Sequence, residues 1–292
     1  MKHQKLPAEL HYRLEKIIGQ PLRQIRYVQR GYTAALRLVA TLADSTSIFV
    51  KIATDSLTAD WLRSEYKIYE TLSGSFLARC LAWDDDGSHP VLVLEDLSQA
   101  YWPPPWTETQ IRRVIETLAD ISQAHVSDLP LLEDDPDLNR GWLNVAEQPE
   151  AFLSLKLVTE KWLKAALPEL LRVDGPEALR GQALLHLDVR SDNICFVDDR
   201  VVFIDWNWAC LGNARFDLGA WLPSLEAEGG PPPETILPDG GEIAALLSGY
   251  FASRAGLPPL PNAPYVRRIQ LTQLKSALPW TVRALNLPPL DI

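Results

Sequence analysis

The chain has 292 residues, 47% of them hydrophobic and 23% charged, which is typical of a globular protein of one or two domains. A formal net charge of −10 argues against nucleic-acid binding, because neutralising phosphates requires a basic surface. The sequence also lacks an apolar run long enough for a membrane span or a signal peptide. Together with three cysteines that lack metal-ligand spacing, this predicts a cytoplasmic protein with no nucleic-acid or membrane partner and leaves its oligomeric state open.

The first hundred residues predict a small antiparallel sheet. Residues 7–18 predict a helix that ends at Gly19, and residues 57–73 predict a second helix. The β-rich runs lie around residues 24–30, 34–41, 47–53, 77–83 and 91–95. Five strands with one inserted helix favour an N-terminal sheet lobe, residues 1–97, which we expect to bind a nucleotide.

The pattern becomes mostly helical after the proline run at residues 103–105. Helices are predicted over residues 107–125, 151–167, 216–226, 240–255 and 264–286. The sequence therefore predicts a bilobal α+β fold, in which residues 98–292 form a larger catalytic and substrate-binding lobe across a cleft from the first. Two acidic stretches, residues 84–86 and 133–137, are expected to be solvated loops, although their carboxylates also offer a cation site.

The segment Leu184-Leu-His-Leu-Asp-Val-Arg-Ser-Asp-Asn-Ile194 is the most informative one. It contains His186, Asp188 and Asn193 in an H-x-D-x-x-x-x-N pattern, and Asp205 follows two short apolar runs that predict a hairpin. A hairpin over residues 194–205 returns Asp205 to the neighbourhood of Asn193. Their oxygens suit Mg2+, and Asp188 remains free to face an acceptor hydroxyl. The alternative is a polar loop with a capping asparagine and a strand-terminal aspartate.

A lysine in the third predicted strand needs a partner. Lys51 lies between Val50 and Ile52, and a buried ammonium group is costly unless it is paired. On the following helix Glu65 falls on the apolar stripe, whereas Glu70 falls outside it. We therefore predict an ion pair between Lys51 and Glu65 that directs the lysine toward nucleotide phosphates. In the alternative, Lys51 extends to solvent and Glu65 lies at the edge of the stripe.

Two further segments of the first lobe are candidates for nucleotide contact. The turn after the first strand contains Gly31 and Thr33, where backbone amides and a hydroxyl can reach phosphates, although an ordinary hairpin turn fits as well. The run at residues 91–97 leads out of the lobe, and the carbonyl of Glu95 and the amide of Leu97 are the expected partners of an adenine edge. A connector with no ligand role has the same pattern.

Together these motifs resemble the aminoglycoside phosphotransferase / choline kinase-like family, a branch of the protein-kinase-like fold, over roughly residues 20–225. The matching segments are the loop from His186 to Asn193, the segment Ile204-Asp205-Trp206 and residues 212–219. The resemblance implies that Asp188 is the catalytic base, that Lys51 is the phosphate lysine, and that Asn193 and Asp205 hold Mg2+. It also implies that His186 and Asp217 support the loop structurally.

The sequence departs from the family pattern at two positions. Leu187 stands where many members have glycine, and Asn213 stands where aspartate is common. The absence of a long activation segment argues against a protein kinase. We therefore expect an ATP (or GTP)- and Mg2+-dependent phosphotransferase that acts on a hydroxyl of a small molecule of the aminoglycoside, amino alcohol or sugar type. A non-catalytic nucleotide-binding module and nucleotidyl transfer on the same fold are the alternatives.

Overall fold

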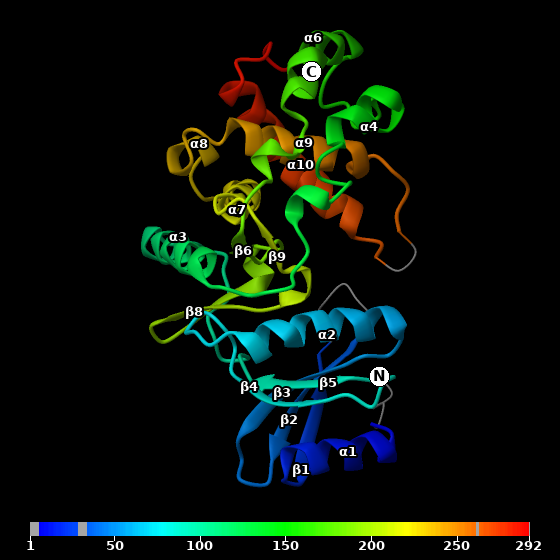
Figure 1. Ribbon diagram of the computed structural model, residues 1–292, viewed down its shortest axis with the longest axis vertical. Helices are drawn as coiled ribbons and strands as arrows, with labels where there is room; N and C mark the ends of the chain where they lie inside the picture. The colour runs from blue at the N-terminus through cyan, green and yellow to red at the C-terminus, as the bar shows by residue number, and fades with distance from the viewer. Residues whose placement is uncertain (1–5, 29–33, 261–262, 292) are drawn as a thin grey trace. The chain divides into compact units, whose positions relative to one another are not determined.

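The computed structural model describes residues 6–28, 34–260 and 263–291, which form two compact units (Figure 1). The first unit comprises Met1–Tyr101 and Cys195–Trp208, and the second comprises Trp102–Ile194 and Ala209–Ile292. The expected division after residue 97 lies close to the first of these boundaries. The prediction assigned residues 195–208 to the C-terminal part, whereas they belong to the first unit. Isolated β-bridges from Phe196 to Tyr101 and from Phe203 to Leu77 connect them to it.

A five-stranded antiparallel sheet forms the centre of the first unit, as the sequence predicts. Its strands follow the order β1-β2-β3-β5-β4, with bounds β1 Leu22–Tyr27, β2 Leu36–Leu42, β3 Ser47–Ile52, β4 Cys80–Asp84 and β5 Val91–Glu95. Helix α1 (Ala8–Ile18) packs on the sheet through Leu14, which is fully buried together with Leu38 and Val50. Burial of these apolar side chains is the main stabilising contribution to this unit.

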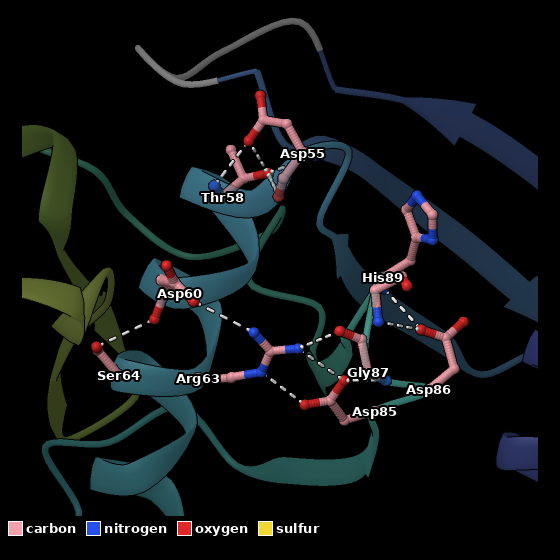
Figure 2. A network of polar contacts seen from close by, with 10 residues as sticks. Asp55, Thr58, Asp60, Arg63, Ser64, Asp85, Asp86, Gly87 and His89 are labelled. Atoms are coloured by element: carbon pink, nitrogen blue, oxygen red, sulfur yellow. Dashed lines mark hydrogen bonds and ion pairs between the residues drawn. The ribbon is translucent and has the colours of Figure 1, made fainter.

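Helix α2 (Ser56–Thr71) is fixed at both its start and its middle (Figure 2). A capping box joins Asp55 and Thr58, whose backbone N–H donates to the Asp55 carboxylate at 2.8 Å. One turn later, the Arg63 guanidinium donates to Asp85 at 2.7 Å and to the Gly87 carbonyl at 3.0 Å. These bonds tie α2 to the loop between β4 and β5, so they fix the helix that carries Glu65.

Five carboxylates of the two acidic stretches form ion pairs within the protein. Their carboxylates pair with arginines: Asp84 and Asp86 with Arg13, Asp85 with Arg63, Glu133 with Arg180, and Asp137 with Arg254. Within the described ranges, no group of three or more His, Cys, Asp or Glu side chains is arranged to hold a metal ion. No helix in the described part of the chain has the length and hydrophobicity that crossing a bilayer requires.

The second unit is mostly helical, as predicted. Its α-helices are α3 Glu108–Gln123, α4 Gly141–Glu147, α5 Glu150–Leu153, α6 Glu160–Val173, α7 Phe216–Ala227, α8 Pro233–Ile236, α9 Gly241–Ala255 and α10 Val266–Ala284. Short 3-10 turns are η1 Leu132–Asp134, η2 Pro176–Ala178 and η3 Ser191–Asn193. Strand β6 (Ala183–Leu185) pairs with β9 (Cys210–Gly212), and Thr281 of α10 donates to Ser248 of α9 inside the core.

The single helix predicted over residues 151–167 is wrong. Helix α5 ends at Leu153, the backbone at Lys156 is left-handed with φ 56°, and α6 begins only at Glu160. The new start is set by Thr159, whose hydroxyl accepts a hydrogen bond from the Trp162 N–H at 3.1 Å. A threonine followed by an acidic residue is an N-cap signal. The prediction missed it because the apolar pattern continues through this position.

Candidate active site

Lys51 of β3 is the centre of a buried charge cluster in the first unit. Its Nζ donates to both carboxylate oxygens of Glu65, at 2.7 Å and 2.8 Å, and also to the carboxylate of Asp205. The Lys51 and Glu65 residues are only 4% and 3% exposed, whereas Glu70 lies on the exposed side of α2. The predicted ion pair is therefore confirmed, and the Asp205 contact adds a partner that lies 154 residues away in the chain.

The charge of Lys51 is set by opposing effects. Burial by itself lowers the pKa of the ammonium group, but the Asp205 and Glu65 carboxylates more than offset this and hold the pKa above its ordinary value. The lysine is therefore a protonated cation held between two carboxyl groups. A cation fixed in this way is suited to bind phosphate oxygens.

Asp205 stands at the end of the hairpin that the sequence predicts. Strands β7 (Ile194–Val197) and β8 (Arg200–Phe203) pair across a two-residue turn, in which Asp198 has φ 49°. Asp205 itself is left-handed with φ 64°, and the turn η4 (Trp206–Trp208) follows it. The fully buried Trp206 donates its indole N–H to the Phe203 carbonyl at 3.0 Å, which fixes the backbone on both sides of Asp205.

Asp188 and Asn193 are in direct contact in the second unit. The side-chain amide of Asn193 donates to the backbone oxygen and to Oδ2 of Asp188, both at 2.9 Å. These bonds use the amide nitrogen, so the amide oxygen of Asn193 is left to serve as a hard ligand of the kind Mg2+ prefers. Sequence reasoning missed Arg190, whose Nε lies 3.1 Å from Asp188 Oδ1. Its position two residues after Asp188 was the available signal.

His186 and Asp217 support the backbone of this loop. Asp217 accepts hydrogen bonds from the backbone N–H groups of His186 at 2.6 Å and Leu187 at 2.9 Å. The imidazole Nδ1 of His186 accepts from the Asp188 N–H at 3.2 Å, and the histidine is fully buried. Burial raises the pKa of Asp217 to about 6, although the two backbone bonds oppose the shift. These contacts fix the backbone of residues 186–188, and so the position of the Asp188 backbone.

The remaining predicted nucleotide contacts have different outcomes. Gly31 and Thr33 lie outside the described residues. The Glu95 carboxylate is buried and accepts from the guanidinium groups of Arg79 at 2.9 Å and Arg200 at 2.7 Å, two partners that the sequence did not reveal. The Leu97 carbonyl accepts from the Ala100 N–H at 3.0 Å. The expected roles of the Glu95 carbonyl and the Leu97 amide stay predictions.

Comparison with known proteins identifies a family. The model of a phosphotransferase enzyme family matches residues 24–257, which is most of the chain. Among curated protein sequences, none matches significantly.

Several solved structures share the fold. A spectinomycin phosphotransferase bound to ADP and spectinomycin is 13% identical with a TM-score of 0.61, and the match covers 98% of this chain and 100% of that one. A choline/ethanolamine kinase family protein from Mesorhizobium loti is 14% identical with a TM-score of 0.60, covering 95% and 97%. A macrolide 2'-phosphotransferase from Brachybacterium faecium is 12% identical with a TM-score of 0.52, covering 97% and 98%. The fold predicted from the motifs is therefore confirmed.

Proposed function

The chain belongs to the phosphotransferase enzyme family, and we propose that it transfers the terminal phosphoryl group of ATP to a hydroxyl group of a small molecule. The observation that carries the proposal is the Lys51 ammonium group, buried and shared by Glu65 and Asp205. A structural ion pair needs only one carboxylate. The second carboxylate at the same cation supports a site built for phosphate groups and a divalent ion.

We assign the nucleotide half of the reaction to Lys51, Glu65 and Asp205. Lys51 would bind the α- and β-phosphates, and Glu65 would hold the lysine in place. Asp205 and Asn193 would supply oxygen ligands to Mg2+, which matches the preference of this ion. Mg2+, when bound, supplies charge neutralisation at the phosphate oxygens.

We assign the acceptor half to Asp188. Its carboxylate would accept the proton of the acceptor hydroxyl while the acceptor oxygen bonds to the terminal phosphorus and the bond from phosphorus to the ADP oxygen breaks. The products are ADP and a phosphorylated alcohol. Asn193 would orient the carboxylate through its 2.9 Å bond to Oδ2, and Asp217 and His186 would hold the loop backbone.

The proposed acceptors are hydroxyl-bearing small molecules of the classes that related folds use. The similar structures are named for spectinomycin, for macrolides and for choline and ethanolamine. They differ in size and charge, so the fold alone does not select among them. The ADP bound to the spectinomycin enzyme supports ATP as the donor.

An acceptor screen tests the proposal. ADP release from ATP and Mg2+ would be measured over panels of aminoglycosides, amino alcohols, sugars and nucleosides, with EDTA and no-acceptor controls. We expect at least one acceptor to stimulate ADP release, and we expect EDTA to abolish that release. Mass spectrometry of the product should show an added phosphate. An added AMP would replace the proposal with nucleotidyl transfer, and nucleotide binding with no product from any acceptor would indicate a non-catalytic module.

A further inference from the structure

Helix α7 holds the loop from His186 to Asn193 at two places. Asp217 in its first turn accepts from the backbone of residues 186 and 187, as described above. At the other end of the helix, the C-cap residue Glu228 accepts a hydrogen bond from the hydroxyl of Ser191. The two carboxylates therefore bind the loop on both sides of Asp188.

The hydrogen bond at Ser191 affects the position of Asn193, because both residues belong to the short 3-10 turn η3. Ser191 is the first residue and Asn193 the last residue of η3, and the Asn193 N–H donates to the Arg190 carbonyl at 2.9 Å. The Asn193 side chain then donates to Asp188. A shift of Ser191 therefore moves the amide group that orients the Asp188 carboxylate.

The second oxygen of Glu228 is also occupied. The indole N–H of Trp106 donates to it at 2.7 Å, and the Trp106 ring packs edge-on against the fully buried Trp221 of α7, with 5.2 Å between ring centroids. Trp106 therefore holds the carboxylate oxygen of Glu228 that Ser191 does not bind. Both donors are neutral, and a carboxylate is a strong acceptor for such donors.

We propose that Glu228 is a positioning residue for phosphoryl transfer. Its carboxylate fixes Ser191, and through η3 it fixes Asn193 against Asp188. The inference rests on the proposed function, because it assigns Glu228 a role in orienting the proposed base. A misplacement of a reacting group by about 1 Å can cost about 100-fold in rate, so a small movement of η3 is sufficient to lower turnover.

Five variants test this role with the most active acceptor of the screen. Glu228→Ala and Ser191→Ala remove the two ends of one hydrogen bond, and each should lower kcat by about 10-fold or more with a smaller change in the acceptor KM. The double variant should be no slower than the slower single variant. Glu228→Gln keeps one acceptor oxygen and should recover part of the rate. Trp106→Phe removes the bond to the other carboxylate oxygen and keeps the Ser191 bond, so its kcat should fall by less than that of Glu228→Ala or Ser191→Ala.

Hydrogen exchange of the amides in residues 186–193 supplies a readout that does not depend on activity. Glu228→Ala and Ser191→Ala should accelerate exchange there, and Trp106→Phe should do so much less. Ser191→Ala removes one hydroxyl only, so it carries the test if Glu228→Ala does not fold.

The outcomes separate the two proposals. An active wild-type enzyme with unchanged kcat in the folded Ser191→Ala and Glu228→Ala variants overturns the positioning role and leaves the proposed function intact. Multiplicative losses in the double variant also overturn it, because the two residues would then act independently. A wild-type protein with no acceptor-dependent ADP release ends the proposed function, and the positioning role with it.

Discussion

The side-chain amide of Asn193 donates to Asp188 twice, once to its backbone oxygen and once to its carboxylate, each at 2.9 Å. The two residues are five positions apart, and the turn η3 brings them together. The carboxylate that we assign as the base is therefore held in one orientation before any substrate binds. Preorganisation of this kind lowers the rearrangement that the transition state requires.

Substitution of the base should separate chemistry from binding. We expect Asp188→Ala to keep nucleotide binding and to lower kcat by about 100-fold or more, the range that loss of a general base gives. Turnover by ADP release and binding by thermal shift with ATP would measure the two effects. Asp192→Ala is a matched control, because Asp192 is an exposed acid in the same loop. Equal turnover in Asp188→Ala and wild type would remove Asp188 from the mechanism.

The Lys51 cluster predicts an order of stability losses. Lys51→Met leaves Glu65 and Asp205 without their shared cation, so it should lower the free energy of unfolding by about 3–5 kcal/mol. Glu65→Gln should cost less, because Asp205 still pairs with the lysine.

Replacing the buried pair tests whether its role extends beyond folding. Lys51→Met/Glu65→Leu should recover part of the stability lost in Lys51→Met, because apolar side chains can replace a buried ion pair. It should not recover nucleotide affinity. Urea unfolding and nucleotide titration would measure the two quantities, and restored affinity in the double variant would rule out Lys51 as the phosphate lysine.

Asp217 predicts a pH effect on stability. Its pKa is raised from 3.8 to about 6 by burial, so the folded protein binds the proton more tightly than the unfolded chain does. The stability from that bound proton is complete below about pH 4 and is lost as the pH rises through about 6, a change of about 3 kcal/mol. The free energy of unfolding of wild type minus that of Asp217→Asn should therefore fall over this range. A pH-independent difference in urea unfolding would contradict the assignment.

The backbone conformation of Leu187 should make a glycine substitution less destabilising than an alanine substitution. Its backbone is left-handed with φ 65°, a conformation that costs a side chain about 1 kcal/mol and costs glycine almost nothing. Leu187→Ala removes the favourable packing of the leucine side chain and keeps the unfavourable backbone conformation. Leu187→Gly removes the same packing but also relieves the backbone cost. We expect the glycine variant to be the more stable of the two by about 1 kcal/mol. A more stable alanine variant in thermal or urea unfolding would show that the backbone conformation is not strained.

Several features could be read from the sequence because they depend on local pattern. The hairpin from Ile194 to Asp205 follows from two apolar runs and a polar turn. The Lys51–Glu65 pair follows from the spacing of apolar residues on one helix, because a carboxylate on a buried stripe requires a cation.

Other features depend on tertiary contact, which local pattern does not encode. Asp205 joins Lys51 across 154 residues, and Glu228 reaches Ser191 across 37. Nothing near Glu228 in the sequence distinguishes it from the other acidic residues of the chain. The break before α6 was missed for another reason, since the apolar pattern continued through it and outweighed the cap signal of Thr159.

The contact between Lys51 and Asp205 has a consequence for ion affinity. The aspartate already has an internal counterion, so the divalent ion that we propose at Asp205 would compete with an ammonium group for the same carboxylate. Phosphate oxygens relieve that competition, because they give the ammonium group a new anionic partner and release the aspartate. We therefore expect the metal ion and the triphosphate to bind as one complex. The phosphate oxygens pair with the ammonium group, and the metal ion binds the carboxylate that is released.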